Sequence, residues 1–259
     1  MLGTLYGRAL ESRSAHPILS DPQAERVVQL IDYDFGKLGM SPVMATSVAL
    51  RARQFDTWTA AFLAQHPEAV VLHLGCGLDS RVFRVDPPPT VSWFDVDYPE
   101  VIDLRQRLYP PRDGYAMIGS SVLEPHWIDQ VPWKRPALIV AEGLSMYLPE
   151  HEGTRLFERM VSHFPTGELA FDTFSRVAVR LGKLNPVVRR TGATLRWGLD
   201  DPRELERAIP RLRVVEDLRA YDLVGPGVDK LPHSYRITLW LMRRIPAMAN
   251  LGRLLRYRF

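Results

Sequence analysis

The 259-residue chain contains a single cysteine, Cys76, which excludes an internal disulfide framework and a cysteine-rich zinc site. It also lacks a long hydrophobic run, because its longest apolar stretches, residues 137–141 and 239–242, are far too short to span a bilayer. Residues 1–10 are interrupted by two glycines and an arginine and do not resemble an export signal. We therefore expect a cytoplasmic protein with no membrane partner.

Metal-ligand spacings are missing as well. None of the seven histidines forms a pattern such as H-x-x-x-H, so we expect no metal site and interpret each histidine as structural or exposed. From Arg243 onward the chain has five arginines and no acidic residue, within a net charge of +3. This basic tail could contact phosphates, but no aromatic stacking platform or helix-turn-helix pattern accompanies it. We interpret it as a solvated end and do not expect a nucleic-acid partner; the sequence leaves the oligomeric state open.

What the chain has is a change of hydrophobic period near residue 66. Before it, apolar residues recur at three- and four-residue steps after the capping-type residues Ser20, Asp21 and Ser41, which predicts an N-terminal helical cap over residues 1–66. After it, short β-prone runs alternate with turns and helical patterns; these runs are residues 70–74, 91–94, 137–141 and 169–171. The alternation predicts an α/β core over residues 67–259, a Rossmann-like, doubly wound and mostly parallel sheet built from right-handed βαβ units.

One stretch breaks the alternation. Residues 176–197 carry scattered arginine, glycine and proline, which indicates either a surface insertion or a lid over a pocket; we favour a lid within about residues 174–208. A short helix at residues 202–208 and strands at residues 212–215 and 235–241 are expected to follow. The lid offers basic side chains that could attract an acidic ligand or could be solvated surface charges, namely Arg176, Arg180, Lys183, Arg189, Arg190 and Arg196.

The densest chemical signal is Gly75-Cys76-Gly77 after the first strand, followed by Asp97 at the end of the second. In an open parallel sheet, ligands bind beyond the carboxyl ends of the strands, and glycine there lets the backbone approach the ligand. A carboxylate that ends the next strand, about 20 residues on, can accept both hydroxyl groups of a ribose. Asp97 suits this role, and Asp95 is the alternative.

The glycine pattern alone does not separate the possible nucleotides. A dinucleotide fingerprint requires a third glycine, whereas Gly77 is followed by Leu78, Asp79 and Ser80. Asp79 would also stand where a pyrophosphate needs neutral or positive surroundings. A sulfonium amino acid fits better, because its α-ammonium group favours a nearby carboxylate. We therefore expect S-adenosyl-L-methionine as cofactor, with S-adenosyl-L-homocysteine as product.

Five stretches, in order, resemble the leucine carboxyl methyltransferase superfamily, and more closely its bacterial branch of tetracenomycin-type polyketide O-methyltransferases. They are the arginine-rich residues 51–56, the glycine motif at 71–81, the acidic second strand at 94–102, Ser120-Ser121-Val122 with Trp127, and residues 142–148, which begin with Glu142. The resemblance covers about residues 32–172 and resumes more loosely at 197–201. It implies the class I methyltransferase fold and an O-methyltransferase activity on a small polyketide-like acceptor.

The resemblance also implies roles for individual residues. Arg51 or Arg53 would pair with the cofactor carboxylate, Gly75 and Gly77 would pass its methionine portion, Asp97 would hold the ribose, and Glu142 would close the other side of the pocket. The protein-methylating branch has an Asp-Leu pair near the adenine, where this chain has Ser121-Val122. Tyr147, five residues after Glu142, would point into the acceptor pocket and orient an oxygen.

Most of these residues have a structural alternative. Arg51 and Arg53 could be exposed helix charges, Asp79 could cap the following helix, and Tyr147 could be a core aromatic. Glu142 is harder to explain structurally, because a carboxylate directly after an apolar strand lies at the rim of the ligand crevice. Cys76 between two glycines is interpreted as a small packing residue without a reactive thiol.

The expected reaction is an in-line transfer of a methyl group to an oxygen of a small acidic or phenolic acceptor. A carboxylate acceptor is already ionised at pH 7, whereas a phenol must lose a proton, and the sequence indicates no clear base. Two other functions stay open: a protein C-terminal carboxyl methyltransferase, and a catalytically inactive protein that keeps the fold and the cofactor.

Overall fold

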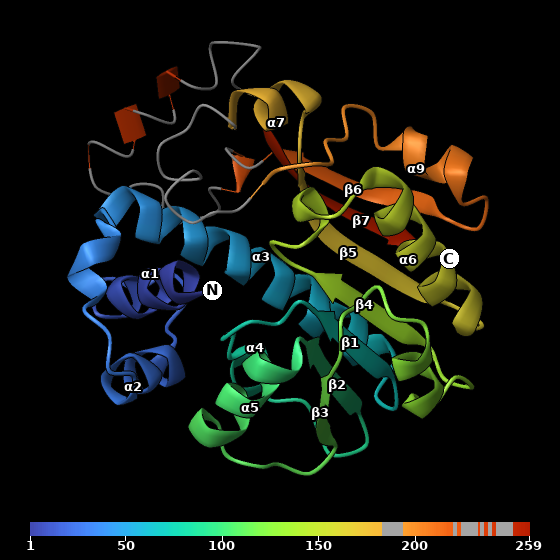
Figure 1. The fold of residues 1–259 in the computed structure, drawn as a ribbon, viewed down its shortest axis with the longest axis horizontal. Coiled ribbons are helices and arrows are strands. Elements are labelled where there is room, and N and C mark those ends of the chain that lie inside the picture. Colours follow the sequence, from blue (N-terminus) through green and yellow to red (C-terminus); the bar gives the residue numbers. More distant parts are fainter. Residues whose placement is uncertain (183–193, 220–221, 224–232, 234–235, 238–239, 242–250) are drawn as a thin grey trace.

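The computed structural model describes residues 1–182, 194–219, 222–223, 233, 236–237, 240–241 and 251–259, and Figure 1 shows its ribbon. The helices are α1 (Leu2–Ser12), α2 (Pro22–Leu30), η1 (Phe35–Leu38), α3 (Pro42–Gln65), α4 (Arg81–Val85), α5 (Pro99–Leu108), η2 (His126–Gln130), η3 (Ser145–Tyr147), α6 (Glu150–His163), α7 (Arg176–Gly182) and α9 (Arg203–Ala208). The strands are β1 (Val70–Leu74), β2 (Ser92–Asp97), β3 (Tyr115–Gly119), β4 (Ala137–Ala141), β5 (Gly167–Phe174), β6 (Arg213–Arg219) and β7 (Gly252–Arg258).

All seven strands form one sheet in the order β3-β2-β1-β4-β5-β7-β6. The pairs β1–β2, β2–β3, β1–β4 and β4–β5 are parallel, whereas β7 runs antiparallel to both β5 and β6. The chain reverses direction across the sheet between β1 and β4, so the loops after these two strands diverge and leave a crevice. The predicted α/β, Rossmann-like and mostly parallel sheet is confirmed.

Helices cover both faces of this sheet (Figure 1), and the alternation of side chains along the strands decides which core each residue joins. Leu72 and Ile139 face the side packed by Phe157 and Met160 of α6. Their neighbours along the strands face the other side, where Phe55, Trp58 and Phe62 of α3 pack. The central strands β1 and β4 are buried along their whole length, which explains why their sequences are apolar apart from His73.

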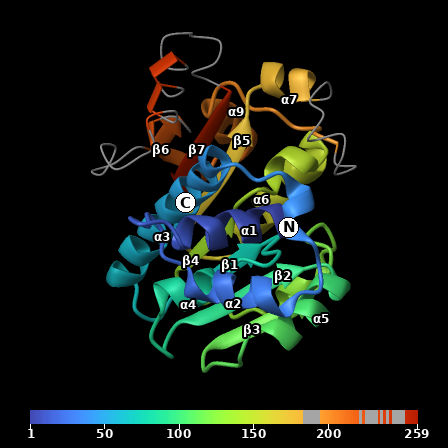
Figure 2. The ribbon, with the colours of Figure 1, turned by 90° about the vertical axis from the view of Figure 1, so that its left-hand side faces the viewer.

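The N-terminal helices lie beside the carboxyl-end loops of the sheet, as the view in Figure 2 shows for α1 and α2. Of the three capping-type residues, Asp21 caps α2 through Ala24 N and Ser41 caps α3 through Met44 N, whereas Ser20 precedes the N-cap of α2. Helix α1 buries Leu5 and Ala9 in a small core of its own, which also packs against Leu78 of the glycine loop. The division into a cap, residues 1–66, and a core, residues 67–259, stays a prediction, since α3 belongs to the layer that covers the sheet.

The basic tail from Arg243 onward was interpreted wrongly where the structure describes it, while residues 243–250 lie outside the described residues. Residues 252–258 are not a solvated end but strand β7, which lies between β5 and β6. Arg253 pairs with Asp217 at 2.7 Å, and Arg256 pairs with Glu216 and Glu168, so these charges are matched within the sheet. The three arginines of β7 hid the strand pattern in the sequence, because the acidic partners of Arg253 and Arg256 lie on other strands.

Two further strand predictions need correction. Strand β3 was missed, since its residues are only partly buried at the edge of the sheet. The strand expected at residues 235–241 is wrong where the structure describes that stretch, because Arg236, Ile237, Trp240 and Leu241 are helical. The apolar residues Ile237, Trp240 and Leu241 are spaced by three and four residues, which suits a helix. The other residues of that stretch lie outside the described ones.

The predicted lid region contains helices α7 and α9, and the expected helix at residues 202–208 is confirmed as α9. Arg176 at the start of α7 is paired with Glu204 at 2.5 Å and with Asp200 at 3.4 Å, so its charge is matched by the protein. Arg180 and Arg196 are exposed, and Lys183, Arg189 and Arg190 lie outside the described residues. Among the helices of the described ranges, none is long and apolar enough to cross a membrane.

The position of β7 predicts how substitutions in the tail affect stability. Leu255→Ala, which empties a fully buried site in the sheet, is expected to lower the free energy of unfolding by about 2–5 kcal/mol. Val215→Ala, on the neighbouring strand β6 at a side chain that is 42% exposed, should change it by less than about 1 kcal/mol. Urea denaturation of both variants measures this; equal effects would show that the tail does not pack as a strand.

Candidate functional site

The glycine loop after β1 has a backbone that other residues adopt poorly. Gly75 and Gly77 have φ angles of +62° and +51°, in the left-handed region that favours glycine. A Cβ atom on Gly75 would lie 3.0 Å from the Leu144 side chain. The two glycines therefore allow the sharp turn and also keep the space above β1 open.

Asp97 fixes this loop to the end of β2. Its Oδ2 atom accepts a hydrogen bond from Gly77 N at 2.7 Å, and its Oδ1 atom accepts one from Tyr98 N at 2.8 Å. Each carboxylate oxygen has a second lone pair, so Asp97 can accept further bonds from a ligand. The hydrogen bond from Gly77 to Asp97 thus connects the loop after β1 to the end of β2.

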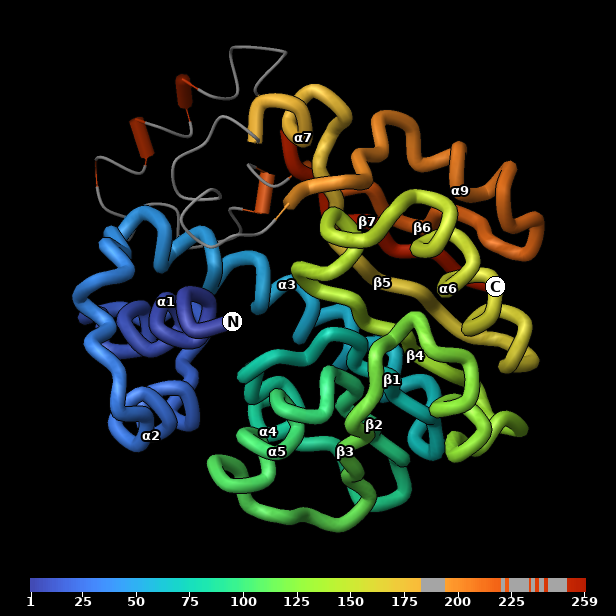
Figure 3. The backbone as a smooth tube through the Cα atoms, in the orientation of Figure 1, coloured from blue at the N-terminus to red at the C-terminus, as the bar shows by residue number. Residues whose placement is uncertain are grey.

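A cavity of about 510 Å³ lies at these strand ends. Figure 3 shows the N-terminus of the chain close to the same loops, and Met1, Thr4 and Arg8 of the α1 segment do line the cavity. Seven of the eleven residues predicted to form the site also line it: Arg51, Gly75, Gly77, Asp79, Asp97, Glu142 and Tyr147. The cavity therefore gathers residues from α1, α3 and the ends of β1, β2 and β4.

Arg51 is not a free helix charge. Its Nε atom donates to Glu142 Oε1 at 2.9 Å and its Nη1 atom donates to Asp172 Oδ2 at 2.8 Å. Burial would lower the pKa of Arg51, but Asp172 and Glu142 outweigh it and raise that pKa. The guanidinium group is held charged at the wall of the cavity, where an anionic group of a ligand can reach it.

Beneath the cavity, Arg81 is completely buried and holds two of the acidic cavity residues. Its Nη2 atom donates to Glu142 and lies 3.1 Å from Asp79 Oδ2, while its Nε atom donates to Asp56 at 2.8 Å. Burial would raise the pKa of Asp79, but Arg84, Arg81 and further cations hold it well below its usual range. Asp79 is therefore ionised and paired.

The alternative role of Asp79 as a helix cap is not what the structure has, since Ser80 is the N-cap of α4 and no side chain caps that helix.

Helix α1 adds a cation that the sequence did not single out. Arg8 is 2% exposed; its Nε atom donates to Asp21 at 3.1 Å and its Nη2 atom donates to Leu78 O at 2.7 Å. It lies 3.8 Å from Asp79, so the N-terminal helix is bound to the glycine loop by charge as well as by apolar packing. No local motif marks Arg8 in the sequence.

Asp95, the alternative ribose ligand, is placed differently from Asp97. It is completely buried and accepts hydrogen bonds from Arg105, from Trp93 Nε1 at 2.9 Å and from Tyr115 OH at 2.6 Å, with His73 Nδ1 at 3.1 Å. Burial would raise the pKa of Asp95, but Arg105 and His73 lower it to about 2. These contacts occupy Asp95 within the protein, away from the cavity wall.

Three other predicted residues do not line the cavity. Arg53 is two residues after Arg51 and lies about 200° around α3 from it. Ser121 accepts a bond from Leu123 N at 3.3 Å, and Val122 is buried. Ser121 and Val122 do follow β3, so they lie at the carboxyl end of the strand next to β2.

Tyr147 and Phe174 form the apolar end of the cavity with Met146. Tyr147 is 44% exposed, so it is not a core aromatic. Burial of its inner part raises the pKa of the hydroxyl group. Tyr147 therefore offers a neutral hydroxyl group that can donate or accept a hydrogen bond.

Cys76 and His73 are both buried in the protein interior. Cys76 is 3% exposed, and burial raises the pKa of its thiol well above the ordinary value, which disfavours the reactive thiolate. His73 is buried between Asp95 and Arg81. Across the described ranges, no group of three potential ligands could hold a metal ion.

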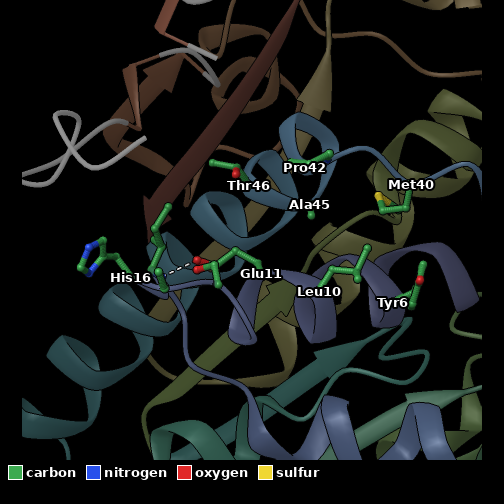
Figure 4. A pocket seen from close by; sticks show the side chains of 11 residues that line it. Tyr6, Leu10, Glu11, His16, Met40, Pro42, Ala45 and Thr46 are labelled. Carbon is green, nitrogen blue, oxygen red and sulfur yellow. Dashed lines mark hydrogen bonds between the residues drawn. The ribbon is translucent and has the colours of Figure 1, made fainter. Parts of the chain in front are cut away.

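Two more cavities adjoin the helical cap. The larger, about 560 Å³, lies between α1 and the start of α3 (Figure 4) and is lined by Tyr6, Leu10, Met40 and Pro42 among others. Its acidic residue, Glu11, is occupied by the backbone N–H groups of Ile18 and Leu19. It shares no lining residue with the 510 Å³ cavity. The smaller one, about 240 Å³, shares Arg51 and Phe174 with that cavity.

Asp172 and Arg81 were not predicted as site residues, although signals for both were present. Asp172 directly follows the apolar run 169–171, so the strand-end argument that selected Glu142 also applies to it. Arg81 closes the glycine motif that was quoted for the resemblance. The contacts of Asp172 with Arg51 and of Arg81 with Asp56 could not be predicted without knowing how α3 packs on the sheet.

The chain is similar in sequence to known methyltransferases. A family model described as leucine carboxyl methyltransferase matches residues 1–109. The tetracenomycin polyketide synthesis O-methyltransferase of Streptomyces glaucescens is 47% identical over 100% of this chain and 95% of its own length. An S-adenosyl-L-methionine-dependent methyltransferase of Gibberella zeae is 33% identical over 83% of this chain and 80% of its own length.

Solved structures share the fold at low sequence identity. A DUF574 family protein from Streptomyces avermitilis has a TM-score of 0.61 at 15% identity and covers 96% of this chain and 99% of its own. The magnesium protoporphyrin IX methyltransferase of Synechocystis PCC 6803, solved with bound S-adenosylhomocysteine, has a TM-score of 0.51 at 12% identity. It covers 92% of this chain and 93% of its own.

The buried pairs predict a large cost when Arg81 is removed. Arg81→Met removes the completely buried cation that Glu142, Asp79 and Asp56 share, and leaves the three carboxylates with Arg51 and Arg84. It is expected to lower the free energy of unfolding by about 3–5 kcal/mol. Arg207→Met, which removes a mostly exposed cation paired with Asp201, should cost less than about 1 kcal/mol. Chemical denaturation compares them, and equal costs would contradict a structural role for Arg81.

Asp95 predicts a pH dependence of stability. Its pKa in the folded protein, about 2, lies below the unfolded value near 3.9, so its contribution is complete above about pH 4 and is lost as the pH falls toward 2. Asp95→Asn is expected to be less stable than the natural protein by about 2–3 kcal/mol at pH 6, with a difference that shrinks between about pH 4 and pH 2. The exposed control Asp103→Asn should show no such trend in urea denaturation at each pH; a constant difference for Asp95→Asn would refute the assignment.

Proposed function

Since this chain belongs to the leucine carboxyl methyltransferase family and is an S-adenosylmethionine-dependent methyltransferase, we propose that it methylates an oxygen of a small polyketide-like acceptor, acidic or phenolic. The main observation in support is that Gly77, Asp97 and Glu142 line one cavity at the carboxyl ends of the parallel strands. The cytoplasmic location expected from the sequence is part of this proposal.

The chemical character of the cavity fits the cofactor. Its volume, about 510 Å³, lies within the usual range for small-molecule sites. Asp97 and Glu142 are acidic and suit the ribose hydroxyl groups and the α-ammonium group, while Arg51 and Arg8 suit the α-carboxylate group. Gly75 and Gly77 line the cavity with backbone alone, since neither carries a side chain.

We assign the roles accordingly. Asp97 would accept both ribose hydroxyl groups, Gly75 and Gly77 would pass the methionine portion, and Arg51 would hold its carboxylate. Ser121 and Val122 follow β3 beside Asp97, which suits the adenine end. Arg53 and Asp95 have no contact with the cavity that supports a direct role, so we leave them out of the assignment.

When bound, S-adenosylmethionine supplies a methyl group activated by a positively charged sulfur. The chain contributes by holding the acceptor oxygen in line with that methyl group, and such alignment contributes up to about 7–11 kcal/mol to a rate. Tyr147 would orient the acceptor oxygen through its neutral hydroxyl group, and Met146 and Phe174 would exclude water. The acidic residues around the cavity favour a cationic sulfur over a neutral one.

Asp97→Asn tests the ribose assignment. Loss of charge from a carboxylate that accepts two hydrogen bonds is expected to weaken S-adenosylhomocysteine binding about 10- to 100-fold, measured by isothermal titration calorimetry. Asp103→Asn, an exposed acidic residue on the adjoining helix α5, should bind as the natural protein does. Unchanged affinity of Asp97→Asn would remove Asp97 from the site.

A labelling experiment tests the activity. Incubation with [methyl-³H]S-adenosylmethionine and polycyclic aromatic polyketides that carry free hydroxyl and carboxyl groups is expected to label the small molecules. Base-labile label identifies an ester and base-stable label an ether. Label found only in protein as a base-labile ester would instead support a protein carboxyl methyltransferase, and absence of label with intact S-adenosylhomocysteine binding would support an inactive binding protein.

A further inference from the structure

The 240 Å³ cavity, called here the distal cavity, adjoins the cofactor cavity, because Arg51 and Phe174 line both. Its other described lining residues come from α3, from the end of β5 and from the chain around β7: Ser47, Val48, Asp172, Thr173, Leu223, Leu251, Gly252, Arg253 and Leu254. At 240 Å³ it is smaller than the roughly 300 Å³ at which complete small-molecule sites begin. Its size suits one part of a ligand whose remainder lies in the adjoining cavity.

Asp172 is the acidic residue among the described side chains that line the distal cavity. It is 5% exposed; its Oδ1 atom accepts from Gly143 N at 2.6 Å and its Oδ2 atom accepts from Arg51 Nη1 at 2.8 Å. Each oxygen retains a lone pair after these bonds. Burial and the nearby Glu142 raise the pKa of Asp172, although Arg51 opposes them. A hydrogen bond donated by a ligand would therefore stabilise this carboxylate.

The rest of the lining is apolar or engaged with other groups. Val48, Leu223, Leu251 and Leu254 contribute hydrophobic side chains and Phe174 an aromatic one. The hydroxyl groups of Ser47 and Thr173 donate to backbone carbonyls, and Arg253 is paired with Asp217 at 2.7 Å. An anionic group here would face Asp172, so the lining favours a neutral group that donates a hydrogen bond.

We propose that the distal cavity binds the end of the acceptor remote from the methylated oxygen, as an aromatic ring whose hydroxyl group donates to Asp172. The proposal rests on the proposed function, because it requires an acceptor that extends from Tyr147 past Phe174. It makes Asp172 and the apolar side chains around it determinants of which acceptors bind. It also predicts a preference for rings hydroxylated at both ends.

A pair of probes tests the hydrogen bond. Protein saturated with S-adenosylhomocysteine is titrated calorimetrically with 2-naphthol and with 2,6-dihydroxynaphthalene, which differ by the second hydroxyl group. The dihydroxy probe is expected to bind about tenfold more tightly, as for a hydrogen bond to a charged group. In Asp172→Asn this preference should fall below about threefold. Glu168→Gln, which changes a carboxylate at the other end of β5, should retain it.

A steric variant tests the location. Ser47→Phe places a large side chain at the distal cavity and is expected to weaken binding of the dihydroxy probe at least about tenfold while leaving S-adenosylhomocysteine affinity unchanged. The matched control is Thr57→Phe, since both hydroxyl groups bond to the carbonyl four residues earlier on α3 and the two positions are about 15 Å apart along the helix. Thr57→Phe should alter neither affinity.

The proposal is overturned if the natural protein binds neither naphthol, binds both equally, or if Ser47→Phe binds the dihydroxy probe as Thr57→Phe does. Failure of the proposed function would appear separately, as lack of S-adenosylhomocysteine binding by the natural protein before any naphthol is added.

Discussion

A buried cluster of alternating arginines and carboxylates holds the functional edge of this protein together. Arg81 lies at its centre with no exposed surface and connects α3, the glycine loop and the end of β4 through Asp56, Asp79 and Glu142. Because an ion without its partner is costly to bury, the carboxylates and arginines of the cluster depend on one another, and the strand ends are fixed relative to one another. The acidic lining of the cavity is balanced by Arg81 beneath it and by Arg8 and Arg51 in its wall.

The same cluster connects the N-terminal helices to the sheet. Arg8 of α1 and Asp21 at the start of α2 pair with each other, and Arg84 of α4 reaches Asp21 at 2.8 Å and Asp79 at 2.7 Å. The helical segment that precedes the first strand therefore supplies part of the cavity wall, and its position is coupled to the charge state of the glycine loop. Residues far apart in the chain therefore line one cavity.

Much of the sheet could be predicted from the sequence, because β1 and β4 are apolar apart from His73 and the helices α2 and α3 have capping residues at their starts. The edge strand β3 and the charged strand β7 were missed, since their side chains find partners only once the sheet exists. At the site, Gly75, Gly77, Asp97 and Glu142 could be selected because strand ends and glycines carry local signals. The position of Arg8 and the different surroundings of Asp95 and Asp97 depend on tertiary contacts, which the sequence does not show. Asp95 faces Arg105 and Asp97 faces the glycine loop, although they are two residues apart on one strand.

Strand β7 lies between β5 and β6 although it follows both in the chain. During synthesis from the N-terminus, β5 and β6 emerge before the strand that separates them, so β6 has no strand partner in the described sheet until residues 252–258 have been made. The open side of β5 is thus exposed on the ribosome for the time needed to make about eighty residues, and Asp172 near its end acquires its native surroundings, including Leu254, only at the last step. The wall that β7 contributes to the distal cavity is therefore made after the half of the sheet that carries the glycine loop can already have folded.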